Sequence, residues 1–264
     1  MDLKLIIGVV IVVIILYIIW SYFSTSIQVI MSFQNGIESS QSQVSGKSVA
    51  KSGKNNYSFS LWTYVSNWNI NYGEQKNILA ISSENPNVPY VFHLALDATR
   101  NDLNVYVDYD NPNGGMSMTD SSGNPDSSSS VQFCKISNFP IQSWVNISVS
   151  VYNRAVDIYI DGKLVKTCPL PNVAAPIGAG STIYIGGVAS GSGNVASSSR
   201  SLTGFDGYIA SVVYNPDVIS PQDAWNIYAR GYSNTGFGLG NLFQRYKLQF
   251  AFLKDNSVVS SLTI

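Results

Sequence analysis

The acidic residues and the single histidine are the first groups that could carry chemistry. The glutamates are Glu38, Glu74 and Glu84, and the histidine is His93. Retaining glycoside hydrolysis needs two carboxyl groups about 5–5.5 Å apart, and these glutamates are scattered over segments expected to be a stalk and loops. His93 lies in an apolar run without a His, Cys or Glu at metal-ligand spacing, which favours a packed strand residue over a catalytic base. The sequence therefore predicts no catalytic residues.

A group of aspartates is the one candidate metal site. Asp97, Asp102, Asp108 and Asp110 fall in one short stretch, and calcium takes six to eight oxygen ligands. The alternative is turn chemistry, since Asp and Asn close β-turns in segments such as "DATRND" and "DYDNPNGG". We favour turns, so no metal site and no cofactor is predicted, with calcium kept as the weaker interpretation.

Two cysteines, Cys134 and Cys168, flank a predicted hairpin over residues 144–165. Antiparallel pairing brings the outer ends of a hairpin together, so the two sulfurs can approach within the distance of a disulfide. Two buried free thiols in a reducing compartment are the alternative. We predict the disulfide, which agrees with a body translocated across a membrane.

Aromatic residues supply the candidate contacts. Trp68, Tyr72 and Tyr90 are suited either to stacking on sugars or to packing in a protein interface, and we favour protein contact. In the tail, "YKLQFAFL" places Tyr246 and Phe250 on one face of a predicted strand. This strand is expected to pair with a partner or with the stalk.

The N-terminal segment has the composition of a membrane span. Residues 3–23, with Leu5, Ile14 and Trp20 among them, form an almost uncharged stretch, and about 20 apolar residues are enough to cross a bilayer as a helix. A cleaved signal peptide is the alternative, but its apolar core is shorter. The prediction is a single-pass membrane protein whose partner is the lipid bilayer, with weak charge bias toward a cytoplasmic N-terminus.

Charge and composition define the rest of the organisation. The formal net charge is −1, which excludes a broad basic face for nucleic acid. Residues 24–56 are rich in Ser, Gln and Asn and are predicted to be a stalk. Residues 57–231 are predicted to form one domain, and residues 232–264 a tail with an extra strand.

The predicted domain is dominated by period-two segments. Strands are expected in "YSFSLWTYV" and "WVNISVSVY", in the hairpin "VDIYIDGKLVKT", and around 77–81, 90–96, 104–109, 183–187 and 208–214. A single helix is predicted after Ser220, with Pro221 in its first turn and Gly231 at its end. These elements predict an all-β sandwich or jelly roll with one short C-terminal helix, preceded by a transmembrane helix.

Four segments, taken in order, resemble one family: "YSFSLWTYVSNW", "WVNISVSVYNRAVDIYIDGKLVKT", "STIYIGG" and "FDGYIASVVYNPDVISPQDAWNIYARG". They are similar to the laminin G-like, concanavalin A-like jelly-roll domains. That resemblance implies a sandwich, and in many members a calcium site at a rim loop. Finer features, such as "WNINYGEQKNIL" and "GLGNLFQRYKLQFAFLKDN", resemble membrane-anchored versions in large DNA viruses.

The resemblance implies a non-enzymatic structural protein, a minor capsid component that links an internal virion membrane to the capsid shell by protein contacts. A lectin-like surface protein that binds glycans is the alternative. A glycan-processing enzyme is a third interpretation, which the scarcity of carboxylates opposes.

Overall fold

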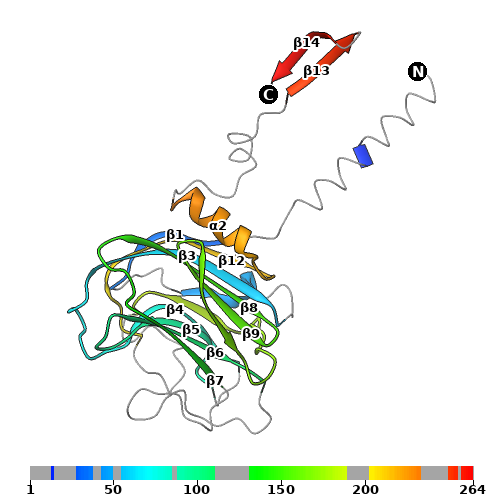
Figure 1. The fold of residues 1–264 in the computed structure, drawn as a ribbon. Helices are drawn as coiled ribbons and strands as arrows, with labels where there is room; N and C mark the ends of the chain where they lie inside the picture. Colours follow the sequence, from blue (N-terminus) through cyan, green and yellow to red (C-terminus); the bar gives the residue numbers. More distant parts are fainter. Residues whose placement is uncertain are drawn as a thin grey trace. The chain divides into compact units, whose positions relative to one another are not determined.

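The computed structural model describes residues 13–14, 28–37, 43–49, 55–84, 88–110, 131–188 and 202–232, and the backbone of 249–254 and 257–263. The chain divides into two compact units, Met1–Tyr232 and Ser233–Ile264. The first unit is an all-β sandwich of two antiparallel sheets with one short helix (Figure 1).

The first sheet, called sheet A, has the strand order β1-β12-β3-β8-β9-β10. Its strands are β1 (Gln28–Asn35), β3 (Tyr57–Asn67), β8 (Trp144–Tyr152), β9 (Ala155–Ile160), β10 (Lys163–Pro169) and β12 (Asp206–Asn215). The predicted tight turn between β9 and β10 is present, with positive φ at Asp161 (49°) and Gly162 (73°), as a two-residue hairpin turn requires.

The second sheet, sheet B, has the order β2-β11-β4-β5-β6-β7. Its strands are β2 (Gln43–Ser45), β4 (Lys76–Ser82), β5 (Tyr90–Leu96), β6 (Asp102–Asp108), β7 (Val131–Ser137) and β11 (Thr182–Ile185); a short 3-10 turn, η1 (Gly46–Ser48), follows β2. The inward side chains of both sheets form one core that includes Phe59, Leu61, Phe92 and Ile147.

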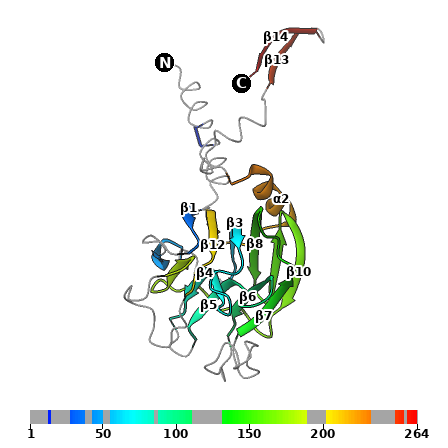
Figure 2. The ribbon, with the colours of Figure 1, turned by 90° about the vertical axis from the view of Figure 1, so that its left-hand side faces the viewer.

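The helix α2 (Pro221–Arg230) covers the side of sheet A that faces away from sheet B, and Figure 2 shows it beside β8 and β10. Its ends confirm the predicted signals. Ser220 is the N-cap in a capping box with Asp223, and Gly231 is the C-cap. Ala224 is buried, and with Ile219 and Tyr159 it forms a small apolar cluster between the helix and sheet A.

The predicted stalk needs correction. Within residues 24–56, Gln28–Asn35 pairs with β12 and Gln43–Ser45 pairs with β11, so these segments are edge strands of the sandwich. Val49 is fully buried in the main core. Ile30 and Met31 pack against the core, and pairing with β12 satisfies the backbone groups of β1. The core therefore begins before Tyr57.

The disulfide prediction is confirmed in its pairing, but its geometry differs from the expected one. Cys134 lies on β7 and Cys168 on β10, with their Cα atoms 6.3 Å apart. These are the edge strands of different sheets, so the bond joins the two layers of the sandwich rather than the ends of one hairpin. The segment Val131–Ser137 was not predicted to be a strand, which is why the hairpin geometry was assumed.

The predicted anchor lies mostly outside the described residues. Val13 and Ile14 are helical, whereas the structure does not describe Leu5 or Trp20. Within the described ranges, the structure contains no helix that is long and apolar enough to span a bilayer.

The second unit holds a hairpin of β13 (Gln249–Lys254) and β14 (Ser257–Thr263), in which Phe250 is in register with Leu262. The predicted tail strand is therefore present, and it pairs with β14 of the tail itself. Its expected pairing with a partner or with the stalk stays a prediction. Tyr246 lies outside the described residues.

Candidate binding surfaces

The outward side chains of sheet A form a cluster of aromatic rings, which we call the aromatic surface. Its members come from β1, β3, β8, β12, α2 and the residue that ends the first unit: Phe33, Trp62, Tyr64, Trp144, Tyr208, Trp225, Tyr228 and Tyr232. Cross-strand register explains the cluster, because Tyr208, Tyr64 and Trp144 are direct neighbours on adjacent strands.

The rings contact one another in a continuous chain. The Trp144 and Tyr232 rings stack with centroids 4.6 Å apart, and those of Phe33 and Tyr208 stack at 5.4 Å. Trp62 stacks on Tyr228 of α2 at 5.7 Å. Such pairs contribute about 0.5–1.5 kcal/mol each beyond the area they bury, so the surface is held in shape by its own contacts.

The surface has a buried support and exposed rings. Trp62 is only 7% exposed, whereas Phe33, Tyr208, Trp225 and Tyr232 are 41–55% exposed. Next to the rings, small polar side chains are satisfied internally: the Ser148 hydroxyl donates to Ser60 (2.9 Å), and the Asn146 amide donates to the Leu61 carbonyl (3.1 Å). The exposed part therefore presents ring faces rather than charges.

A second region, which we call the polar rim, lies at the ends of β5 and β6 in sheet B. It joins the β3–β4 loop, the β5–β6 turn and β7, and its members are Trp68, Tyr72, Lys76, Asp97, Thr99, Arg100, Asp102, Asn104 and Lys135. The Gly73 amide donates to the Ala98 carbonyl (3.0 Å), which holds the loop against the turn.

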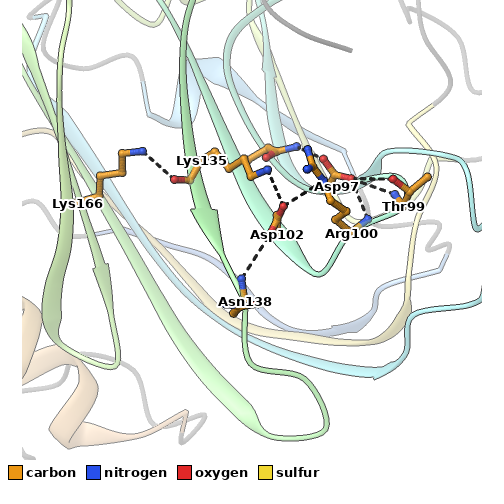
Figure 3. A network of polar contacts seen from close by, with 8 residues as sticks. Asp97, Thr99, Arg100, Asp102, Lys135, Asn138 and Lys166 are labelled. Atoms are coloured by element: carbon orange, nitrogen blue, oxygen red, sulfur yellow. Dashed lines mark hydrogen bonds and ion pairs between the residues drawn. The ribbon is translucent and has the colours of Figure 1, made fainter. Parts of the chain in front are cut away.

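The carboxylates of the polar rim are already occupied (Figure 3). Asp97 accepts hydrogen bonds from the backbone amides of Thr99 and Arg100, both at 3.0 Å. Asp102 forms ion pairs with Lys135 at 2.7 Å and with Arg100 at 3.6 Å. The turn interpretation of these aspartates agrees with this geometry.

The four calcium candidates do not converge. Asp97 directly follows β5 and Asp102 begins β6, whereas Asp108 ends β6 and Asp110 follows it. Seven residues of strand separate the two pairs by about 20 Å. Among the described residues, no group of three or more His, Cys, Asp or Glu side chains is placed to hold a metal ion.

Two ionisable groups of the polar rim have shifted pKa values. Burial would raise the pKa of Asp97, but hydrogen bonds from Thr99, Arg100 and Asn104 outweigh it and lower the pKa below 3.8. Burial lowers the pKa of Lys76, an effect opposed by Asp97 and Glu74. The Lys76 ammonium lies 5.2 Å from the centre of the Trp68 ring.

The predicted aromatic contacts are divided between different places. Tyr72 is 62% exposed at the polar rim, whereas Trp68 packs partly against the main core. Tyr90 is buried in a smaller cluster on the outer face of sheet B, where its ring lies 5.1 Å from that of His93. The side chain of Phe250 is not described. The aromatic surface itself was not predicted, although Trp62 and Tyr64 alternate on a face of β3 that also carries serines.

Two antiparallel sheets with a closing helix make this body an all-β sandwich of the jelly-roll type, and part of it is similar to the laminin G domain. A family model of the laminin G domain matches residues 116–217, the part that contains β7 to β12. No curated protein sequence matches the chain.

Solved structures that resemble the chain include binding domains of botulinum neurotoxin. The serotype D ligand-binding domain in complex with N-acetylneuraminic acid is 13% identical, with a TM-score of 0.42, over 67% of this chain and 36% of the other. A structure of botulinum neurotoxin type C, a toxin whose cell entry is dependent upon interaction with two ganglioside molecules, is 14% identical with a TM-score of 0.44. The match covers 66% of this chain and 36% of the other. A C/D mosaic receptor-binding domain is 10% identical, with a TM-score of 0.48, over 78% and 46%. The chain thus spans less than half the length of these structures.

Proposed function

We propose that this protein is a non-enzymatic attachment protein, in which an N-terminal membrane anchor carries a laminin G-like body that binds a second component at the polar rim. The observation that carries this proposal is the composition of the polar rim. The backbone hydrogen bond from Gly73 to Ala98 holds the loop that carries the exposed Tyr72 ring against the β5–β6 turn. That turn carries Arg100, whose side chain is 70% exposed. Asp97 and Asp102 are held by neighbouring donors, which suits positioning rather than proton transfer.

Carbohydrate is the ligand class that fits this arrangement. Binding sites for small molecules combine aromatic walls with a few fixed polar groups. An exposed tyrosine ring offers a face to the C–H groups of a sugar, and the Arg100 guanidinium supplies several donors in a fixed plane. The network with Asp102 and Lys135 holds this edge of sheet B in place. A lectin-like protein is therefore the proposed function.

A structural role is the second candidate, with the body linking an internal virion membrane to a capsid shell. The disulfide between β7 and β10 favours it, because this bond braces the two sheets against separation. The chemical difference between the two sheets also favours it, since a body that lies between two layers needs two unlike contact faces.

The test uses the full chain in phosphatidylcholine nanodiscs, applied to a glycan array and to capsid shells from detergent-extracted particles. Tyr72→Ala should reduce glycan binding about tenfold, equivalent to about 1.4 kcal/mol, and Arg100→Ala should act in the same direction. Tyr152→Ala is the matched control, since Tyr152 is 57% exposed at the far end of β8. Equal binding by all three variants would exclude the polar rim as the site, and retention on shells without glycan binding would favour the structural role.

A further inference from the structure

The aromatic surface has no role in the function proposed above, and its chemistry points to an occupant. The strands β1, β3 and β8 contain no charged residue, and β12 contains only Asp206. The exposed rings are Phe, Tyr and Trp, the side chains that gather where a bilayer meets water. Their apolar bodies enter the headgroup region, and the hydroxyl and indole groups keep polar partners there.

The length of the tether limits where this surface can lie. The predicted anchor ends at Phe23 and β1 begins at Gln28. Four residues lie between them, and the five steps from the Cα atom of Phe23 to that of Gln28 span at most about 18 Å. The strand β1, with eight residues, is about 26 Å long. The tether is thus shorter than the strand that it feeds, and Phe33 of the aromatic surface lies on that strand.

The end of the first unit is attached to the same face. The Ser211 hydroxyl of β12 donates to the Tyr232 carbonyl at 3.2 Å, and the Tyr232 ring stacks on Trp144. Both connections of the body, the one that enters β1 and the one that leaves after Tyr232, therefore start from sheet A. Sheet A can therefore contact the membrane that holds the anchor without a longer connection between the anchor and β1.

We infer that the aromatic surface lies against the headgroup layer of the bilayer that holds the anchor, so that sheet A is the membrane-facing layer of the body. This inference rests on the proposed anchor. Because the surface is uncharged, the contact needs no anionic lipid and is insensitive to salt. The polar rim belongs to the other sheet and stays available to a ligand.

The test uses the full chain labelled with 5-fluorotryptophan in phosphatidylcholine nanodiscs that carry a gadolinium-chelating headgroup lipid. Tryptophan-to-phenylalanine substitutions assign each fluorine resonance. We expect loss of the Trp225 and Trp144 resonances, with the Trp68 resonance of the polar rim retained as an internal control. The pattern should be the same at low and high salt.

Two charged substitutions supply the second arm. Phe33→Asp combined with Tyr208→Asp should restore the Trp225 resonance, because a carboxylate on the surface opposes its entry into the headgroup layer. Tyr152→Asp, at the far end of β8, should leave the pattern unchanged. Circular dichroism shows whether each variant is folded.

The outcomes separate this inference from the proposed anchor. If the Trp20 resonance survives next to the gadolinium lipid, the anchor is wrong. If the Trp20 resonance is lost while Trp225 and Trp68 are equally retained, the anchor holds and the membrane-facing assignment is wrong. If Trp225 is protected in detergent and this protection increases with protein concentration, a second copy of the chain covers the aromatic surface. That result would also overturn the inference.

Discussion

The aromatic surface and the polar rim are built on the same kind of antiparallel strand but hold their outward side chains in opposite ways. On sheet A the outward rings stack across strands, as Tyr64 does with Trp144. On sheet B the outward charges form ion pairs, as Asp102 does with Lys135. The inward faces of both sheets are equally apolar. The core therefore determines the fold, and the outward positions give each sheet a different surface chemistry.

The largest effect is expected from the disulfide, which joins the two sheets that carry these regions. Cys134→Ser or Cys168→Ser opens a link across 34 residues, which should lower the free energy of unfolding by about 3–4 kcal/mol and the melting temperature by about 10 °C. Cys134 precedes Lys135, so amide hydrogen exchange should accelerate more in β7 than in β3. The melting temperature of the double variant should not change when reductant is added. If the melting temperature of wild type is also unchanged by reductant, the prediction is wrong.

Trp62 tests whether the aromatic surface has a buried support. Trp62→Ala should cost about 3 kcal/mol, because the ring is almost fully buried and stacks on Tyr228. Trp225→Ala is the matched control and should cost less than about 1 kcal/mol, because Trp225 is 46% exposed. Urea unfolding measures both. Equal losses would mean that the exposed and buried rings do not form separate layers.

Much of the fold could be predicted because its signals are local. Period-two alternation identified β3, β5 and β8, and the capping residues Ser220 and Gly231 located α2. The edge strand β2 was missed because it has three residues in a segment rich in Ser and Gln, and β1 was missed because it lies close after the apolar N-terminal stretch. Their strand conformation depends on pairing with β12 and β11, which a local pattern does not contain.

The two surfaces were predictable to different degrees. Part of the polar rim was visible in the sequence, since Asp97, Asp102 and Tyr72 were named as candidates. Arg100 and Lys135 were not. The aromatic surface was not visible, because its rings come from positions as distant as Phe33, Trp144 and Tyr232. Only the sheet order brings them together. The available signal was the pair Trp62 and Tyr64 on a face otherwise occupied by serine.

Asp102 tests the rigidity of the polar rim. Asp102→Ala should cost about 2 kcal/mol, since it leaves the Lys135 ammonium and the Asn138 amide without their acceptor. Asp110→Ala is the matched control, with an exposed side chain and an expected change within about 0.5 kcal/mol. Thermal unfolding measures the difference. A neutral Asp102→Ala variant would show that the ion pair does not hold this edge of sheet B.

The smallest effect is a pH dependence confined to the polar rim. The pKa of Asp97 in the folded protein lies below 3.8, so the unfolded chain binds the proton first as the pH falls. The stability that charged Asp97 supplies is therefore complete above pH 4 and is lost as the pH falls through the folded pKa. Asp97→Asn lacks this contribution, so its melting temperature should lie below that of wild type at pH 5, and the difference should shrink toward pH 2.

The Asp97 carboxyl can also be followed directly by carbon NMR, where its titration midpoint should lie below 3.8. Asn104→Ala removes one of the hydrogen bonds to the charged form and should move this midpoint upward, toward the ordinary value. A wild-type midpoint at or above 3.8 would mean that burial outweighs the hydrogen bonds. The members of the aromatic surface include no carboxyl group, so membrane contact should stay constant between pH 2 and 5 while the stability supplied by the polar rim changes. A joint response of both regions would remove the distinction between them.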